Sequence, residues 1–102
     1  MTTNDITTPT DITTIVERPD VLGALANLVQ EHATALADVQ AKHKAGLYTD
    51  HDSYECDFED ANDSHIIACV AYHAALQIIK GKRINKEQTD YIECCLCVAG
   101  IL

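Results

Sequence analysis

The chain contains no tryptophan, and aromatic residues (Phe, Trp and Tyr) make up only 5% of its 102 positions. Any core must therefore be filled by Ala, Ile, Leu, Val and Cys, which favours helices that approach one another closely. No apolar run reaches the length of a membrane-spanning helix, so we expect no membrane partner. The chain length of 102 residues predicts a single domain, residues 1–102, that closes one modest core without metal or disulfide bonds.

Positive charge is also scarce. Seven Lys and Arg residues stand against sixteen Asp and Glu, which leaves a formal net charge of −9. Such a charge repels nucleic acid and anionic membranes, so we expect no direct binding of DNA or RNA. The basic cluster of Lys80, Lys82, Arg83 and Lys86 is too small to make a nucleic-acid footprint. The natural counterpart is a basic surface, such as that of a nucleic-acid-binding protein or complex.

Signals for secretion and for disulfide pairing are missing as well. The first ten residues, MTTNDITTPT, contain neither the basic region nor the apolar region of a signal peptide. Five cysteines is an odd number, and the neighbours Cys94 and Cys95 cannot easily join each other on a helix. We therefore expect a cytoplasmic protein in a reducing environment.

The first half of the chain carries two helical patterns. Residues 1–8 are Thr-rich and polar, which is typical of a flexible arm, and a short helix should follow and end before Pro19. Pro19 opens a second helix that we expect to run to about Ala45, because residues 42–44 are basic and Gly46 follows them.

A third helix is predicted after an acidic loop. Capping candidates at residues 62–64 precede a helix from roughly His65 to Lys80, which Gly81 ends. This helix is apolar around most of its circumference, so it should be central in the fold. The acidic loop covers residues 46–63. Together these elements predict an all-α fold, a compact bundle of about four helices with one long acidic loop.

The fourth helix has the clearest start signal. Asn85 and Gln88 stand at the spacing of a capping box, and the helix should run to about Ala99. The segment from Cys94 to Leu102 is strongly apolar, so we expect it to be buried.

The acidic loop is the most distinctive feature. It holds seven carboxylates and no Lys or Arg between Asp50 and Asp63, so it must face water, a cation or a basic partner. Tyr48, Tyr54 and Phe58 lie in or beside it. Because Tyr is common at interface centres, these aromatics favour a docking surface over a loop that only keeps the protein soluble. The predicted partner-binding residues are Asp50, Asp52, Tyr54, Glu55, Asp57, Phe58, Glu59, Asp60 and Asp63.

Two metal sites are conceivable, and neither pattern is complete. Residues 50–52 begin like a calcium loop, but Gly is missing at the sixth position and the terminal Glu is misplaced. A zinc site could form between the third and fourth helices from His65, Cys69, His73, Cys94 and Cys97. The turn residues of a zinc knuckle are absent there, and free Cys often packs as a small apolar residue, so core packing is favoured. We predict no metal and no cofactor.

No catalytic signature is present. The chain lacks a Gly-rich elbow or an oxyanion loop, and a bundle this small leaves little room for a substrate pocket, so we predict a protein that is not an enzyme. Two alternatives remain open. One is a small-molecule sponge or enzyme with a pocket between the third and fourth helices. The other is a self-associating structural or assembly protein whose apolar C-terminal helix forms a homodimer seam from Ile92, Leu96, Ile101 and Leu102.

In size, charge and lack of a catalytic motif, the chain resembles the small phage-encoded inhibitors of host defence, of the anti-CRISPR and DNA-mimic type. The resemblance covers this general character and the segment from Asp50 to Asp63. It implies that the seven carboxylates occupy a Lys- and Arg-lined channel meant for nucleic acid and block that channel by competition. It also implies that a phage-encoded chain would act in the host cytosol.

Overall fold

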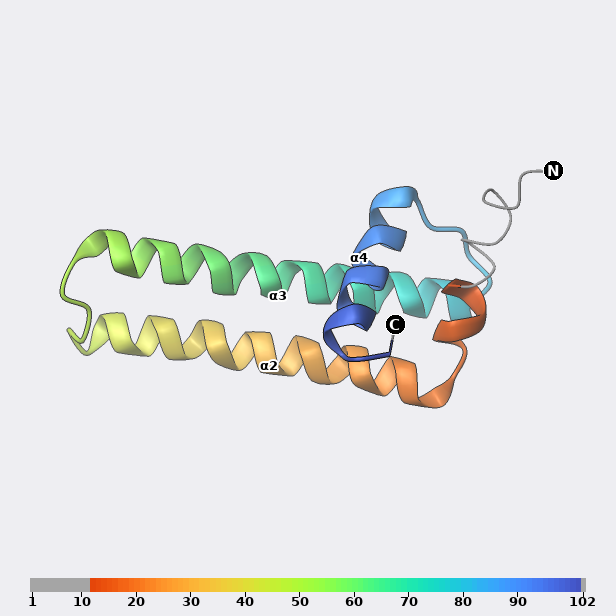
Figure 1. Ribbon diagram of the computed structural model, residues 1–102, viewed down its shortest axis with the longest axis horizontal. Helices are drawn as coiled ribbons and strands as arrows, with labels where there is room; N and C mark the ends of the chain where they lie inside the picture. Colours follow the sequence, from red (N-terminus) through yellow and green to blue (C-terminus); the bar gives the residue numbers. More distant parts are fainter. Residues whose placement is uncertain (1–11, 102) are drawn as a thin grey trace.

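The computed structural model describes residues 12–101, and all regular structure in that range is helical. A short helical segment at residues 12–16 precedes three longer helices, α2 (Pro19–Lys44), α3 (His51–Ile79) and α4 (Lys86–Val98). Helices α2 and α3 form a long antiparallel hairpin (Figure 1). Helix α4 lies across the half of the hairpin where the chain enters α2 and leaves α3. The prediction of an all-α fold is confirmed.

Helix α2 begins and ends where the local sequence predicts. Pro19 occupies the first helical position, where its missing N–H costs no hydrogen bond. At the other end, the backbone N–H of Gly46 donates to the carbonyl of His43, and that of Leu47 donates to the carbonyl of Lys42. This pair of bonds requires a positive φ at residue 46, a conformation that glycine adopts readily, and φ at Gly46 is 74°.

The acidic segment is helical, which corrects the prediction of a loop at residues 46–63. Helix α3 begins at His51 and not at His65, so only residues 45–50 join it to α2. Residues 62–64, interpreted above as a helix cap, lie within the helix. The prediction of one long acidic loop is therefore wrong, and the negative charge is carried by a rigid element.

Two features explain why this segment folds as a helix despite its charge. Asp50 is the N-cap residue, and its side chain accepts a hydrogen bond from the backbone N–H of Ser53 at 2.7 Å. Half-buried Tyr54, Phe58 and Ala61 then recur at four- and three-residue steps, which gives the segment one side that can pack. The apolar period was hidden by the density of carboxylates between these residues.

The C-terminal end of α3 and both ends of α4 agree with the prediction. Helix α3 ends at Ile79, and Gly81 follows with a φ of 80°. Before α4, the side chain of Asn85 accepts from the backbone N–H of Gln88, and the Gln88 side chain accepts from the backbone N–H of Asn85, both at 2.8 Å. The predicted capping box is therefore present, and α4 ends at Val98.

The core lies entirely at the α4 end of the hairpin. Its buried side chains come from the segment at 12–16, the first third of α2, the second half of α3, and α4. Helix α3 packs against both α2 and α4, so its predicted central place is confirmed. Its contribution is mainly alanine, which lets the three helices approach closely. The buried residues are Ile12, Val16, Val21, Leu25, Leu28, Ala68, Ala71, Ala74, Ala75, Ile78, Ile92, Cys95 and Leu96.

The C-terminal segment is only partly buried, which corrects the expectation for Cys94 to Leu102. Cys95 and Leu96 lie in the core, but Cys94 and Cys97 are exposed and Val98 is 66% exposed. The reason is geometric: a helix that packs by one side keeps the opposite side in water, whatever its composition. The predicted flexible arm at residues 1–8 and Leu102 lie outside the described residues. Within residues 12–101, no helix is both long and apolar enough to cross a membrane.

Candidate functional site

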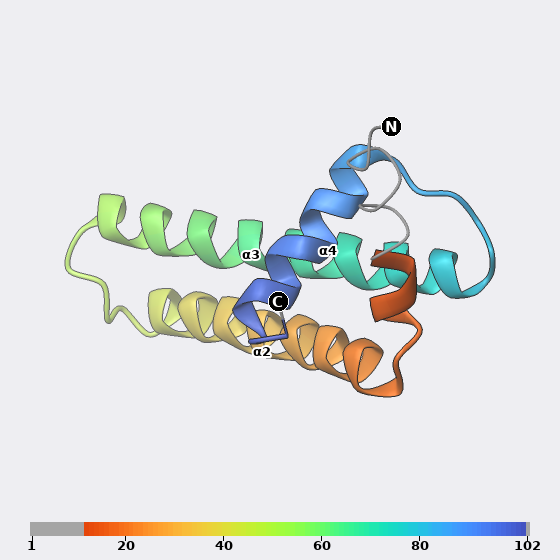
Figure 2. The same cartoon turned by 45° about the vertical axis from the view of Figure 1, so that its right-hand side comes forward.

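Half of the hairpin extends beyond the core. Between Leu28 and Ala68 no residue is fully buried, although α2 and α3 run side by side over this stretch (Figure 2). Half-buried Leu36 and Val39 continue the apolar stripe of α2 into it. The molecule therefore presents a two-helix projection whose tip is the connection at residues 45–50.

An aromatic cluster joins the two helices at this tip. The His43 ring, on α2, stacks on the Tyr54 ring, on α3, with centroids 3.7 Å apart and planes inclined by 15°. Tyr48 meets Tyr54 edge-on at 5.6 Å, and Phe58 lies 5.9 Å from Tyr54 on its other side. Such ring pairs each add about 0.5–1.5 kcal/mol beyond the area they bury. We call His43, Tyr48, Tyr54 and Phe58 the aromatic cluster.

One carboxylate is tied to this cluster. The hydroxyl of Tyr48 donates to Oδ2 of Asp57 at 3.0 Å. Partial removal of water around the phenol, and then the hydrogen bond to this carboxylate, raise the pKa of Tyr48 above its usual value. Tyr48 therefore remains a protonated donor at neutral pH, and the bond fixes the connection between the helices to the side of α3.

A second carboxylate is used by the helix itself. The Asp50 side chain accepts from the backbone N–H of Ser53 and from its hydroxyl, at 2.7 and 3.2 Å. The backbone bond first, and then the hydroxyl bond, hold the pKa of Asp50 below its usual value. Asp50 is thus an anion that stabilises the start of α3, where the helix dipole also favours negative charge.

The remaining five carboxylates form one face of α3. At about 100° of rotation per residue, they fall within an arc of roughly 140° on the side of the helix opposite Tyr54 and Phe58. All five are exposed. Glu55 lies 2.8 Å from Nε2 of His51, and the other four make no hydrogen bond or ion pair with any residue in 12–101. We call this set the acidic face: Asp52, Glu55, Glu59, Asp60 and Asp63.

The predicted partner-binding residues thus separate into groups with different surroundings. The acidic face is exposed and only Glu55 of its members has a partner, His51. Asp50 and Asp57 are engaged within the molecule, and Tyr54 and Phe58 are half-buried in the aromatic cluster. His43 was not predicted as part of the site, because the basic residues 42–44 indicated only the end of a helix. The spacing of His51 and Glu55, one helical turn apart, was a usable signal for a helix in this segment.

The proposed zinc ligands are not brought together. Cys69 Sγ lies 3.5 Å from Nε2 of His65, but His73 is exposed, and Cys94 and Cys97 face solvent on α4. Among residues 12–101, no group of three or more His, Cys, Asp or Glu side chains could hold a metal ion. The preference for core packing is wrong for His73, Cys94 and Cys97, since each of them is exposed.

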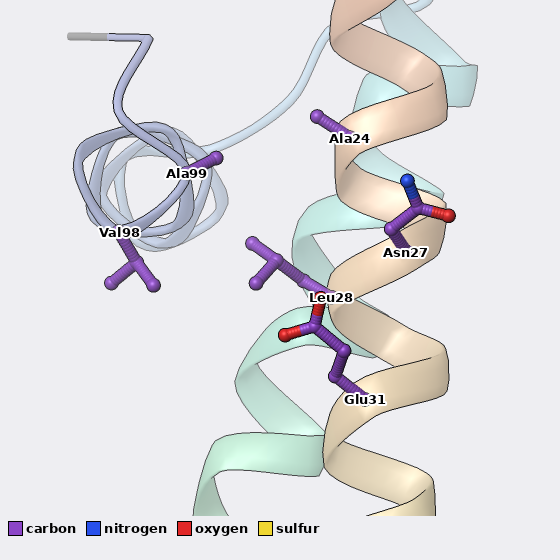
Figure 3. Close-up of a pocket in the computed structure, with 6 residues that line it drawn as sticks. All are labelled: Ala24, Asn27, Leu28, Glu31, Val98 and Ala99. Atoms are coloured by element: carbon purple, nitrogen blue, oxygen red, sulfur yellow. The ribbon is translucent and has the colours of Figure 1, made fainter.

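The structure also bears on the two alternative sites, the homodimer seam on the C-terminal helix and the pocket between the third and fourth helices. Ile92 and Leu96 have no exposed surface, so these two members of the predicted homodimer seam pack inside the chain, whereas Ile101 is half-buried and Leu102 lies outside the described residues. A hollow of about 350 Å³ does exist, but it lies between α2 and the end of α4 and not between α3 and α4 (Figure 3). Its lining is largely small or apolar, with one carboxylate: Ala24, Asn27, Leu28, Glu31, Val98 and Ala99.

Comparison of the chain with protein-family models, with curated proteins and with solved structures finds no match of any of the three kinds.

Proposed function

We propose that this chain is a non-enzymatic inhibitor that binds a basic, nucleic-acid-binding surface of a partner protein through its acidic face. The observation that carries the proposal is the set of five exposed carboxylates on one side of a projecting helix, four of which have no hydrogen-bond or ion-pair partner among residues 12–101. These five share one side of α3, and the aromatic cluster holds that helix against α2.

The charge spacing supports competition with nucleic acid. From Asp52 to Asp63 the helix rises by roughly 16 Å, which places about one negative charge every 3–4 Å along its axis. A single DNA strand carries one phosphate per about 3.4 Å of helix axis. A groove of Lys and Arg side chains arranged for phosphates would therefore meet a similar density of negative charge on the acidic face. In this respect the protein acts as a nucleic-acid mimic of the anti-CRISPR kind.

Charge reversal at two positions tests the proposal. The variant Glu59→Lys/Asp63→Lys changes two exposed carboxylates one turn apart on the acidic face, and Glu17→Lys/Glu31→Lys makes the same change in net charge elsewhere. Binding is measured with a partner captured from the native host and then purified. We expect the first variant to lose binding and the second to retain most of it.

Salt and nucleic acid provide independent measurements on the same complex. Binding should weaken steeply as ionic strength rises, and a duplex or single strand that the partner normally holds should compete with the chain. If binding survives reversal of Glu59 and Asp63 and nucleic acid does not compete, the acidic face is not the recognition surface.

A further inference from the structure

The fold separates three neighbouring cysteines of α4 into two environments. Cys95 faces the core, and burial raises its pKa to about 11, so it remains a neutral thiol. Cys94 and Cys97 are exposed. With about 100° per residue, Cys94 lies directly opposite the mean direction of the buried Ile92 and Leu96, and Cys97 lies about 60° to one side of it, so both thiols are on the outer side of α4.

Two thiols at this spacing suit a metal ion better than a disulfide. Residues three apart on a helix have Cβ atoms about 5–6 Å apart, whereas a disulfide needs about 3.5–4.5 Å. A tetrahedral zinc ion with Zn–S bonds of about 2.3 Å holds its sulfurs roughly 3.8 Å apart, which two side chains converging from such Cβ positions can reach. The pair can therefore chelate an ion without distorting the helix.

One copy of the chain supplies only half of such a site. Structural zinc takes four protein ligands, and residues 12–101 contain no group of three or more His, Cys, Asp or Glu side chains that could hold a metal. Val98, which is 66% exposed, lies beside the two thiols on α4 and adds apolar surface that a second molecule would cover. The missing pair of thiolates is available, in the same geometry, on a second copy.

We propose that Cys94 and Cys97 of two copies together bind one zinc ion and join the chains through α4. Binding converts four thiols and Zn²⁺ into a tetrathiolate with a charge of −2 and releases four protons, so no oxidant or reductant is needed. The acidic faces lie toward the opposite end of each hairpin from α4, which keeps the two strongest negative surfaces apart (Figure 1). This site is independent of the proposed function.

The test is a zinc titration of the full, reduced chain, with the molecular mass followed by sedimentation equilibrium. We expect the mass to double on addition of zinc, at a stoichiometry of one ion per two chains. Cobalt in place of zinc should give the visible spectrum of a tetrahedral thiolate site. The variant Cys94→Ser/Cys97→Ser should lose both effects, while Cys56→Ser/Cys69→Ser, which removes the same number of thiols from α3, should keep them.

Because Cys94 and Cys97 are both exposed, the variant Cys94→Ser/Cys97→Ser should fold, and its helical circular dichroism should match that of the natural chain. A mass that remains that of one chain at saturating zinc would overturn the proposal. So would a dimer that the Cys94→Ser/Cys97→Ser variant still forms, or an ion bound one per chain.

Discussion

The ring of His43, near the end of α2, lies flat against the ring of Tyr54, in the first turn of α3, with 3.7 Å between their centroids. Both rings lie outside the core: His43 is 15 residues beyond the buried Leu28 along α2, and Tyr54 is 14 residues before the buried Ala68 along α3. The contact therefore joins the two helices where the core does not reach.

Replacing the central ring should therefore loosen the tip. We expect Tyr54→Ala to lower the free energy of unfolding by about 1–3 kcal/mol, because it removes four ring contacts at once. Tyr54→Phe keeps the ring and is the matched control, with an expected change below about 0.5 kcal/mol. Urea denaturation measures both. Equal effects of the two substitutions would contradict a role for ring packing.

A helix breaker in the acidic segment distinguishes a helix from a loop. Glu59 lies in the interior of α3 and is exposed, so Glu59→Pro should cost about 3 kcal/mol and reduce helical circular dichroism, while Glu59→Ala should be nearly neutral. Amide hydrogen exchange should show protection from about Tyr54 onward in the natural chain. Rapid exchange throughout residues 51–63, together with no loss of stability on Glu59→Pro, would show that the segment is a loop.

The N-cap of α3 should make stability depend on acid. The pKa of Asp50 is lower in the folded chain than its usual value of 3.8, so its contribution is present above that value and is lost as the pH falls through the lower, folded pKa. Asp50→Asn keeps a capping side chain without a charge that titrates. We expect this variant to lose less stability than the natural chain between neutral pH and pH values below the folded pKa, as followed by thermal melting across pH.

Tyr48 should contribute in the alkaline range with the opposite sign. Its folded pKa is raised above 10.0, so the stabilisation is fully present below that pH and disappears as the pH rises through the folded value. Asp57→Asn removes the carboxylate and should move the ionisation of Tyr48 toward its ordinary range. Ultraviolet titration of the phenols measures the shift, and Asp60→Asn, on the acidic face, serves as the control that leaves it unchanged.

The sequence indicated the candidate site only through the residue types that gather in one segment. The count of carboxylates and the nearby aromatics were visible, and they indicated a docking surface. Which carboxylates are free could not be read, because that depends on the helical phase of the segment and on two bonds, from Tyr48 to Asp57 and from Ser53 to Asp50. The five members of the acidic face share an environment only once α3 is known to begin at His51.

Local sequence alone determined the ends of the helices at Gly46, Gly81 and Asn85, because each of these ends is closed by hydrogen bonds among residues within five positions of one another. It also determined the net charge and the alanine-rich core. Only the tertiary structure decided that the acidic segment is helical and which cysteines are exposed. Both outcomes depend on contacts between distant parts of the chain: the packing of α3 on α2 in the first case, and the direction from which α4 meets the hairpin in the second.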